Sequence, residues 1–193
     1  MKESRSWRTV DIVVTAAIAV AFGVVFWAWN ALWAAASPVF VAVPPAQNIL
    51  YGTWLAAAVV AGLVVQKPGA ALFAELVAAS VSLILGSQWG LDAAISGLFQ
   101  GAGAELAFAL LRYRRWDLIA ALLAAALSAV GAWLHDTPLY YAALPLADQL
   151  LIGAFMLISA LVIAGYGSWW LTRALVQTGV LAQFPSGRSQ ERV

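Results

Sequence analysis

The chain has 193 residues, of which 64% are apolar and only 10% are charged, and its net charge is +1. So little polar surface cannot cover a water-soluble globule of this length, and the protein must therefore be solvated by lipid. The absence of cysteine excludes disulfides, the single histidine excludes the usual Cys/His zinc sites, and the lack of a basic stripe argues against a nucleic-acid partner. We expect no resident metal or cofactor.

Six apolar stretches are each long enough to cross a bilayer, which takes roughly 17 to 25 residues. They lie near 11–33, 47–65, 70–86, 93–111, 118–134 and 149–172. The first stretch follows a basic segment, as a secretory signal does, but it exceeds the length of a signal core and is predicted to be an uncleaved span. The sequence thus predicts an all-α membrane protein with a single transmembrane domain over 1–193. The polar segment 178–193 is predicted to be a mobile cytosolic tail.

The basic residues give the orientation of the spans, because cytoplasmic loops carry the excess of lysine and arginine. With six spans, all ten fall on one side of the membrane. They are Lys2, Arg5, Arg8, Lys67, Arg112, Arg114, Arg115, Arg173, Arg188 and Arg192. The opposite connections contain none. This asymmetry favours six spans over five or seven, and it predicts that both termini are cytosolic.

Two glutamates, Glu75 and Glu105, fall within the third and fourth predicted spans. Carboxylates are costly in hydrocarbon, so both should face the bundle interior, where they lie at similar depth and could meet. A substrate or coupling role and a purely structural role between helices both remain open. Gln100 lies nearer the outside and is a better candidate for ligand contact, with an interhelical amide bond as the alternative.

The outer ends of the spans are rich in aromatic, amide and acidic side chains. Ring faces beside acids suit a flat heteroaromatic ligand, particularly a cationic one, although an aromatic belt at the membrane surface would look similar. The candidates in this outer group are Trp33, Trp89, Trp133, His135, Tyr140, Tyr141 and Asp148. For His135 a surface or capping role is the alternative to ligand contact.

Several motifs are missing from the sequence. It has no GxxxxGK[ST] loop for ATP phosphates, so a partner would have to supply the energy for uphill transport. The outer half contains no lysine or arginine, so the ligand should be neutral or cationic. No nucleophile or paired-acid constellation is recognisable, which argues against an enzyme. A membrane-embedded enzyme, an assembly protein and an ion-coupled carrier remain as alternatives.

Three strings of residues carry a family resemblance. They are Lys67-Pro68-Gly69-Ala70-Ala71 leading to Glu75; Gly86-Ser87-Gln88-Trp89-Gly90; and Gly97 with Gln100-Gly101, continuing through Glu105 to Tyr113-Arg114-Arg115-Trp116. Together with the order of six short spans, they make the chain from Arg8 to about Thr172 resemble an S component. This is the substrate-capture subunit of an energy-coupling-factor (ECF) vitamin transporter, here of the YkoE type linked to thiamine and its hydroxymethylpyrimidine precursor.

The resemblance implies a six-helix bundle in a bacterial inner membrane, with a pocket that opens outward. It also implies a T-type membrane subunit and two ATPase subunits as partners, with small residues of the first helix packing against the T subunit. Ala17 and Ala21 have the spacing for this contact, although packing within the bundle would leave the same pattern.

In thiamine-specific S components of a sister family, a histidine after the fifth helix, outer tryptophans and a carboxylate on the fourth helix hold the ligand. His135 and Trp133 are placed for similar roles, whereas Asp92 lies near the mouth and Glu105 lies deep. The expected function is capture of thiamine or hydroxymethylpyrimidine for an ATP-driven importer. Another neutral or cationic vitamin is the alternative.

Overall fold

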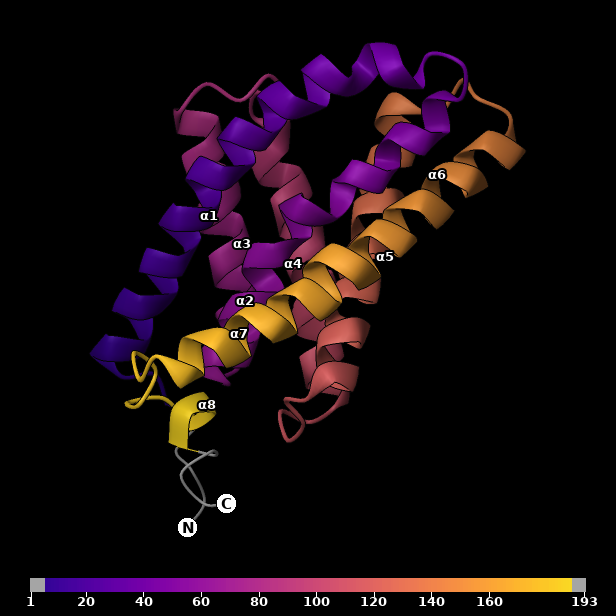
Figure 1. Ribbon diagram of the computed structural model, residues 1–193. Coiled ribbons are helices and arrows are strands. Elements are labelled where there is room, and N and C mark those ends of the chain that lie inside the picture. Colours follow the sequence, from indigo (N-terminus) through magenta and orange to yellow (C-terminus); the bar gives the residue numbers. More distant parts are fainter. Residues whose placement is uncertain (1–5, 189–193) are drawn as a thin grey trace.

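The computed structural model describes residues 6–188, and the regular elements among them are all helical (Figure 1). The α-helices are α1 (Thr9–Ala36), α2 (Ala56–Val65), α3 (Ala70–Ile84), α4 (Asp92–Leu110), α5 (Leu118–Tyr140), α6 (Leu146–Ser159), α7 (Ser168–Gln177) and α8 (Pro185–Arg188). Two 3-10 helices, η1 (Ser37–Phe40) and η2 (Pro44–Leu55), precede α2, and a π-helix, η3 (Ala160–Gly167), joins α6 to α7. The prediction of an all-α fold is confirmed.

These elements form six apolar segments, because η2 continues directly into α2 and α6 continues through η3 into α7. By length and composition, five segments of the described chain can cross a membrane, while α3, with 15 residues, is shorter. α3 is bounded by Gly69 and Gly86, whose φ angles of 88° and 93° end the helical path. α5 runs beyond the predicted end at residue 134 and through Pro138, which places Asp136 on a helix rather than in a loop.

The centre of the bundle is α2, in which every residue is buried. It packs against α1, α3, α4, α5 and α7, so it has no face left for lipid (Figure 1). Around it, α4 and α5 approach closely because glycine stands at their contacts. A Cβ at Gly103 would lie 2.2 Å from the Leu127 carbonyl oxygen, and a Cβ at Gly131 would lie 2.3 Å from that of Phe99. Small residues thus set the spacing of the helices, as is common in membrane bundles.

A buried ion cluster ties the start of α1 to the connection between α2 and α3. The Asp11 carboxylate lies 2.7 Å from Nη2 of Arg8 and 2.5 Å from Nζ of Lys67. Lys67 also donates to the Ser6 carbonyl oxygen at 2.5 Å. The Asp11 side chain is fully buried, so these cations and their hydrogen bonds must compensate for its desolvation.

The segment after α7 covers the same end of the bundle. Leu181 and Phe184 are buried against Val60, Val64 and Val65 of α2, and Ser186 Oγ donates to the Val64 carbonyl oxygen at 3.0 Å. The start of α1 and α8 therefore lie at one end of the molecule (Figure 1). Of the tail predicted to be mobile, Leu181, Phe184 and Ser186 pack against α2, and residues 189–193 lie outside the described residues.

Replacing Lys67 tests the buried cluster. In Lys67→Met, Asp11 keeps only Arg8, so we expect the free energy of unfolding to fall by about 3 kcal/mol. Arg115→Met is the matched control: Arg115 pairs with Asp117, both side chains are about half exposed, and such a pair is worth less than about 1 kcal/mol. Thermal unfolding in detergent measures both variants. Equal midpoints for the two would contradict the role assigned to Lys67.

Candidate functional site

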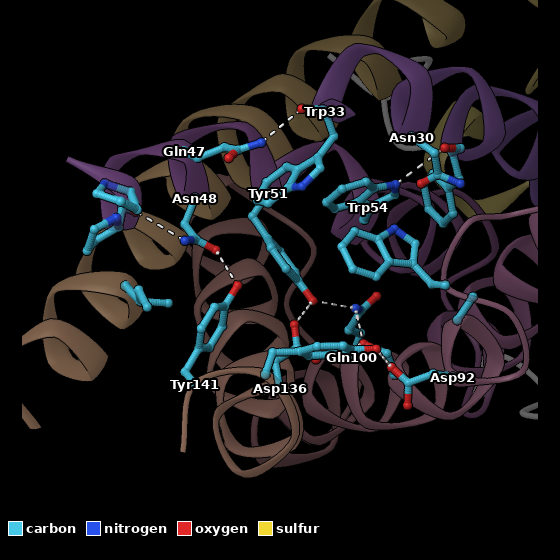
Figure 2. A pocket seen from close by; sticks show the side chains of 18 of the residues that line it. Asn30, Trp33, Gln47, Asn48, Tyr51, Trp54, Asp92, Gln100, Asp136 and Tyr141 are labelled. Carbon is cyan, nitrogen blue, oxygen red and sulfur yellow. Dashed lines mark hydrogen bonds between the residues drawn. The ribbon is translucent and has the colours of Figure 1, made fainter. Parts of the chain in front are cut away.

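A cavity of about 530 Å³ opens where α1 and α5 end and α6 begins. Its wall is built by residues of α1, η2, α3, α4, α5 and α6 and of the connections between them (Figure 2). This size is typical of sites for small organic ligands, which range over about 300–1,000 Å³.

One wall of the cavity is made by η2. A 3-10 helix has three residues per turn, so side chains three positions apart lie in line along one face. Asn48, Tyr51 and Trp54 have this spacing, all three are buried in the bundle, and all three line the cavity (Figure 2). The winding of η2 thus presents an amide, a phenol and an indole to the same space.

Aromatic rings form one part of the cavity wall. The Trp33 ring centroid lies 5.1 Å from that of Trp54 and 6.4 Å from that of Trp89, and the Trp54 and Trp89 centroids are 6.3 Å apart at an interplanar angle of 89°. Tyr140 extends the group, with its centroid 5.7 Å from that of Trp89. These rings come from α1, η2, the α3–α4 connection and α5, and they offer both faces and edges to a flat ligand.

Four polar side chains, those of Tyr51, Asp136, Gln100 and Ser96, form a hydrogen-bonded network that we call the floor of the cavity (Figure 2). The Tyr51 hydroxyl donates to Asp136 Oδ2 at 2.6 Å, and Gln100 Nε2 donates to the Tyr51 oxygen at 3.1 Å. Gln100 Nε2 also lies 2.7 Å from Ser96 Oγ, which lies 3.4 Å from Asp136 Oδ1. The Gln100 carbonyl oxygen and one lone pair each on the Tyr51 and Ser96 oxygens remain available to a ligand.

His135 lies behind this floor, between two carboxylates. Its Nδ1 is 2.8 Å from Asp136 Oδ1, and its Nε2 is 3.3 Å from Asp92 Oδ1. The Tyr140 hydroxyl donates to the other oxygen of Asp92. The histidine does not itself line the cavity, but it links two acids that do, so it fixes their positions.

The charged residues that line the cavity, among those the structure describes, are all acidic: Asp92, Asp136 and Asp148. Burial, with the nearby Asp136 carboxylate, raises the pKa of Tyr141 to about 12. Its hydroxyl is therefore a neutral donor at physiological pH, and it lies 3.5 Å from Asn48 Oδ1. The cavity thus favours neutral or cationic ligands.

Asn30 of α1 offers an unused acceptor. Its amide nitrogen donates to Ser87 Oγ at 3.1 Å and lies 3.4 Å from Ser82 Oγ, while its Oδ1 atom is buried and has no recorded partner. Leaving a carbonyl unpaired away from water is unfavourable. Asn30 lines the cavity, but this oxygen has almost no accessible surface, so a ligand N–H group would reach it only after the side chain turns.

The predicted site residues divide into two sets. Those that line the cavity are Trp33, Trp89, Gln100, Tyr140, Tyr141 and Asp148. Four others do not line it: Glu75, Glu105, Trp133 and His135. Of these, only His135 is connected to the cavity through its carboxylate neighbours.

The two glutamates, which the sequence suggested could meet, have separate hydrogen-bond partners. Glu75 is fully buried and accepts from the Ala58 backbone nitrogen at 2.8 Å, where η2 has passed into α2. Glu105 accepts from the Gly69 backbone nitrogen at 2.6 Å and from the Tyr113 hydroxyl at 2.8 Å. It thereby caps the N-terminal end of α3, where backbone N–H groups lack helical partners.

Trp133 is turned toward α6, where its Nε1 donates to the Gln149 carbonyl oxygen at 2.9 Å. Its indole packs against Gly153, at which a Cβ would lie 3.0 Å from Nε1. This residue therefore joins α5 to α6 rather than lining the cavity.

Other cavity residues were not among the predicted candidates. They include Asn30, Asn48, Tyr51, Trp54, Asp92, Ser96 and Asp136. Some carried a signal in the sequence: Asn30 is an amide inside the first apolar stretch, and Asp136 directly follows the only histidine. No signal in the sequence indicated that the η2 residues would lie in line, because this arrangement depends on 3-10 rather than α winding.

Comparisons with known proteins give consistent results. The family model described as "ABC-type cobalt transport system, permease component" matches residues 10–131. A protein of Bacillus subtilis (strain 168) with the name "Putative HMP/thiamine permease protein YkoE" is 31% identical over 189 residues, which are 97% of this chain and 94% of that protein. A solved structure described as "Crystal structure of an S-component of ECF transporter" superimposes with a TM-score of 0.92 at 31% identity, over 97% of this chain and 94% of the other. These proteins are transporter components, not enzymes.

Proposed function

The chain belongs to the YkoE-type S components of ECF transporters, and we propose that its cavity captures thiamine or the hydroxymethylpyrimidine precursor of thiamine. As a member of this family it is a multi-pass membrane protein that binds substrate. It works with an ECF T subunit and ATPase subunits rather than as an enzyme.

The observation that carries the proposal is the combination of aromatic rings and acids in one cavity without a basic residue among its described lining. Thiamine consists of a flat aminopyrimidine and a cationic thiazolium ring, and hydroxymethylpyrimidine is its neutral half. Stacked rings suit both molecules, and acids suit the cation. The name of the Bacillus subtilis relative supports the same ligands.

The polar groups suggest how the two rings are held. The aminopyrimidine offers an N–H donor and ring-nitrogen acceptors, which match the acceptors and donors of the Gln100–Tyr51–Asp136 floor. We assign the hydrogen bonds to the aminopyrimidine to Asp136 and Gln100, because neither Glu75 nor Glu105 lines the cavity. The thiazolium is assigned to Asp148, which lies in the first turn of α6 and for which no ion pair is recorded within residues 6–188.

A metal ion is a less suitable substrate, despite the cobalt description of the family model. Cobalt is usually held by imidazole, thiolate or several carboxylate ligands. Among residues 6–188 no group of three or more such side chains is arranged to hold an ion. Another neutral or cationic vitamin remains the alternative, and binding measurements distinguish it.

In the proposed orientation, the cavity opens to the outside of the cell. α4 starts at the cavity with Asp92, and its other end is followed by Arg112, Arg114 and Arg115. Lys67 contacts the start of α1 at that same far end. The positive-inside rule then gives cytosolic termini and a cavity open to the exterior.

The face of α1 that turns away from the bundle is proposed to contact the T subunit. Thr15, Ala19 and Gly23 form the buried face of α1, whereas Ala17 and Ala21 are exposed. Packing inside the bundle therefore does not account for these two alanines. A pair of small residues four positions apart allows close approach of another helix.

Asp148→Asn separates the two proposed ligands. Removing one carboxylate should weaken the thiazolium site, so we expect the dissociation constant of thiamine to rise about tenfold. Hydroxymethylpyrimidine lacks the cation and should bind within about twofold of its wild-type affinity. Isothermal titration calorimetry measures both. Equal losses for the two ligands would contradict the assignment of Asp148 to the cation.

Tryptophan fluorescence tests whether the cavity is the binding site. Thiamine and hydroxymethylpyrimidine should quench the wild-type signal, while biotin and riboflavin should not bind. In Trp54→Leu we expect at least about a tenfold loss of affinity, because a stacking platform is removed. Trp170→Leu is the control, since Trp170 is 60% exposed on α7 and lies outside the cavity. Retained affinity in Trp54→Leu would exclude this cavity.

The double variant Ala17→Leu/Ala21→Leu tests the partner face. Bulkier side chains should prevent close helix contact, so we expect it to lose co-purification with coexpressed T and ATPase subunits. Ligand affinity should stay within about twofold, because neither residue lines the cavity. Ala102→Leu, at an exposed position of α4, serves as control. An intact complex in the double variant would show that the T subunit binds elsewhere.

A further inference from the structure

The 3-10 winding of η2 extends over 12 residues, although runs longer than about four residues are uncommon. Its effect on the cavity is large. In the 3-10 form Asn48 and Trp54 lie in line, whereas in an α-helix they would lie about 120° apart around the axis. η2 is continuous with α2, which has α winding, so contacts from other elements to its middle turn can decide which winding it keeps.

A single hydroxyl group makes such a contact. Ser159 Oγ donates to the Ile49 carbonyl oxygen at 2.5 Å and accepts from the Gly52 backbone nitrogen at 2.8 Å. Ile49 and Gly52 are three residues apart, which is the pair of carbonyl and N–H that one 3-10 turn brings together. The hydroxyl bridges this carbonyl and this N–H, so it ties the middle turn of η2 to the end of α6.

The contact requires an unusually close approach of two backbones. A Cβ at Gly52 would lie 2.4 Å from the Ser159 carbonyl oxygen and 2.8 Å from its Oγ, so no larger residue fits. Ser159 is 1% exposed and ends α6 at the point where the π-helix η3 begins. On the other side of η2, Trp29 Nε1 donates to the Leu50 carbonyl oxygen at 2.9 Å. The middle turn of η2 is thus held from both α1 and α6.

We propose that Ser159 is a positioning residue for ligand capture. It does not line the cavity, yet it holds the turn that carries Tyr51 and flanks Asn48 and Trp54. Without its hydroxyl, η2 relaxes from 3-10 winding, and the three side chains no longer face the cavity together. This role of Ser159 rests on the proposed function only for the identity of the ligand.

The first measurement needs no ligand. Hydrogen exchange of residues 44–55, followed by mass spectrometry, is compared in the wild-type protein and in Ser159→Ala. We expect exchange of this segment to be about tenfold faster in the variant. The matched control is Ser168→Ala, which removes a buried hydroxyl with no recorded hydrogen-bond partner and should leave the segment within about twofold of wild type.

The second measurement connects winding to binding. The dissociation constant of thiamine should rise about tenfold in Ser159→Ala and stay within about twofold in Ser168→Ala. If Ser159 acts through η2, then Ser159→Ala combined with Trp54→Leu should lose less affinity than the product of the two single losses. A merely structural role would instead lower the unfolding midpoint and give multiplicative losses.

Unchanged exchange in Ser159→Ala, or faster exchange with unchanged affinity, would overturn the proposal. If the wild-type protein binds neither thiamine nor hydroxymethylpyrimidine, the proposed ligand is wrong, and the exchange comparison alone decides whether Ser159 holds η2. Should Ser159→Ala fail to fold, Ser159→Cys, which keeps a weaker donor at the same position, provides the same comparison.

Discussion

The buried carboxylate of Asp136 is the interaction on which the cavity depends. A carboxylate away from water is costly unless its oxygens have partners, and for Asp136 these come from η2, α4 and α5: the Tyr51 hydroxyl at 2.6 Å, Ser96 Oγ at 3.4 Å and His135 Nδ1 at 2.8 Å. Satisfying this one group therefore fixes three elements relative to one another. The same bonds orient Tyr51 and, through it, Gln100, so stability and ligand recognition share a network.

Polar side chains are concentrated at the two ends of the bundle, with an apolar centre between them. At one end the Asp11 cluster joins α1 to the connection after α2, and at the other the acids and amides line the cavity. Between them α2 is apolar throughout and completely buried. Glu75 is a buried acid near this centre, and it binds the backbone of Ala58 where the 3-10 winding has given way to α winding. Because this centre is closely packed, the shape of the cavity depends on the loops and on η2.

The sequence was sufficient to predict the six apolar segments, because length and hydropathy decide which segments can cross a bilayer. It also identified cavity residues such as Trp33, Gln100 and Tyr141 from their chemistry at the ends of spans. The partners of Glu105 and the rotation of Trp133 were not predictable, since both depend on how neighbouring helices cross. The winding of η2 was equally hidden, because a contact 107 residues away in sequence, between Ser159 and Gly52, accompanies it. Asp136 was not predicted to line the cavity, because the fifth span was predicted to end at residue 134, before Pro138.

We expect the acidic, aromatic cavity to select a neutral or cationic ring system. Calorimetric titration of the purified protein with thiamine and with thiamine pyrophosphate tests it directly, because the two ligands share both rings and differ in the negative charge of the pyrophosphate. We expect thiamine to bind at least about tenfold more tightly, since the cavity acids repel the pyrophosphate. Equal affinity for the two, or tighter binding of the pyrophosphate, would contradict the account.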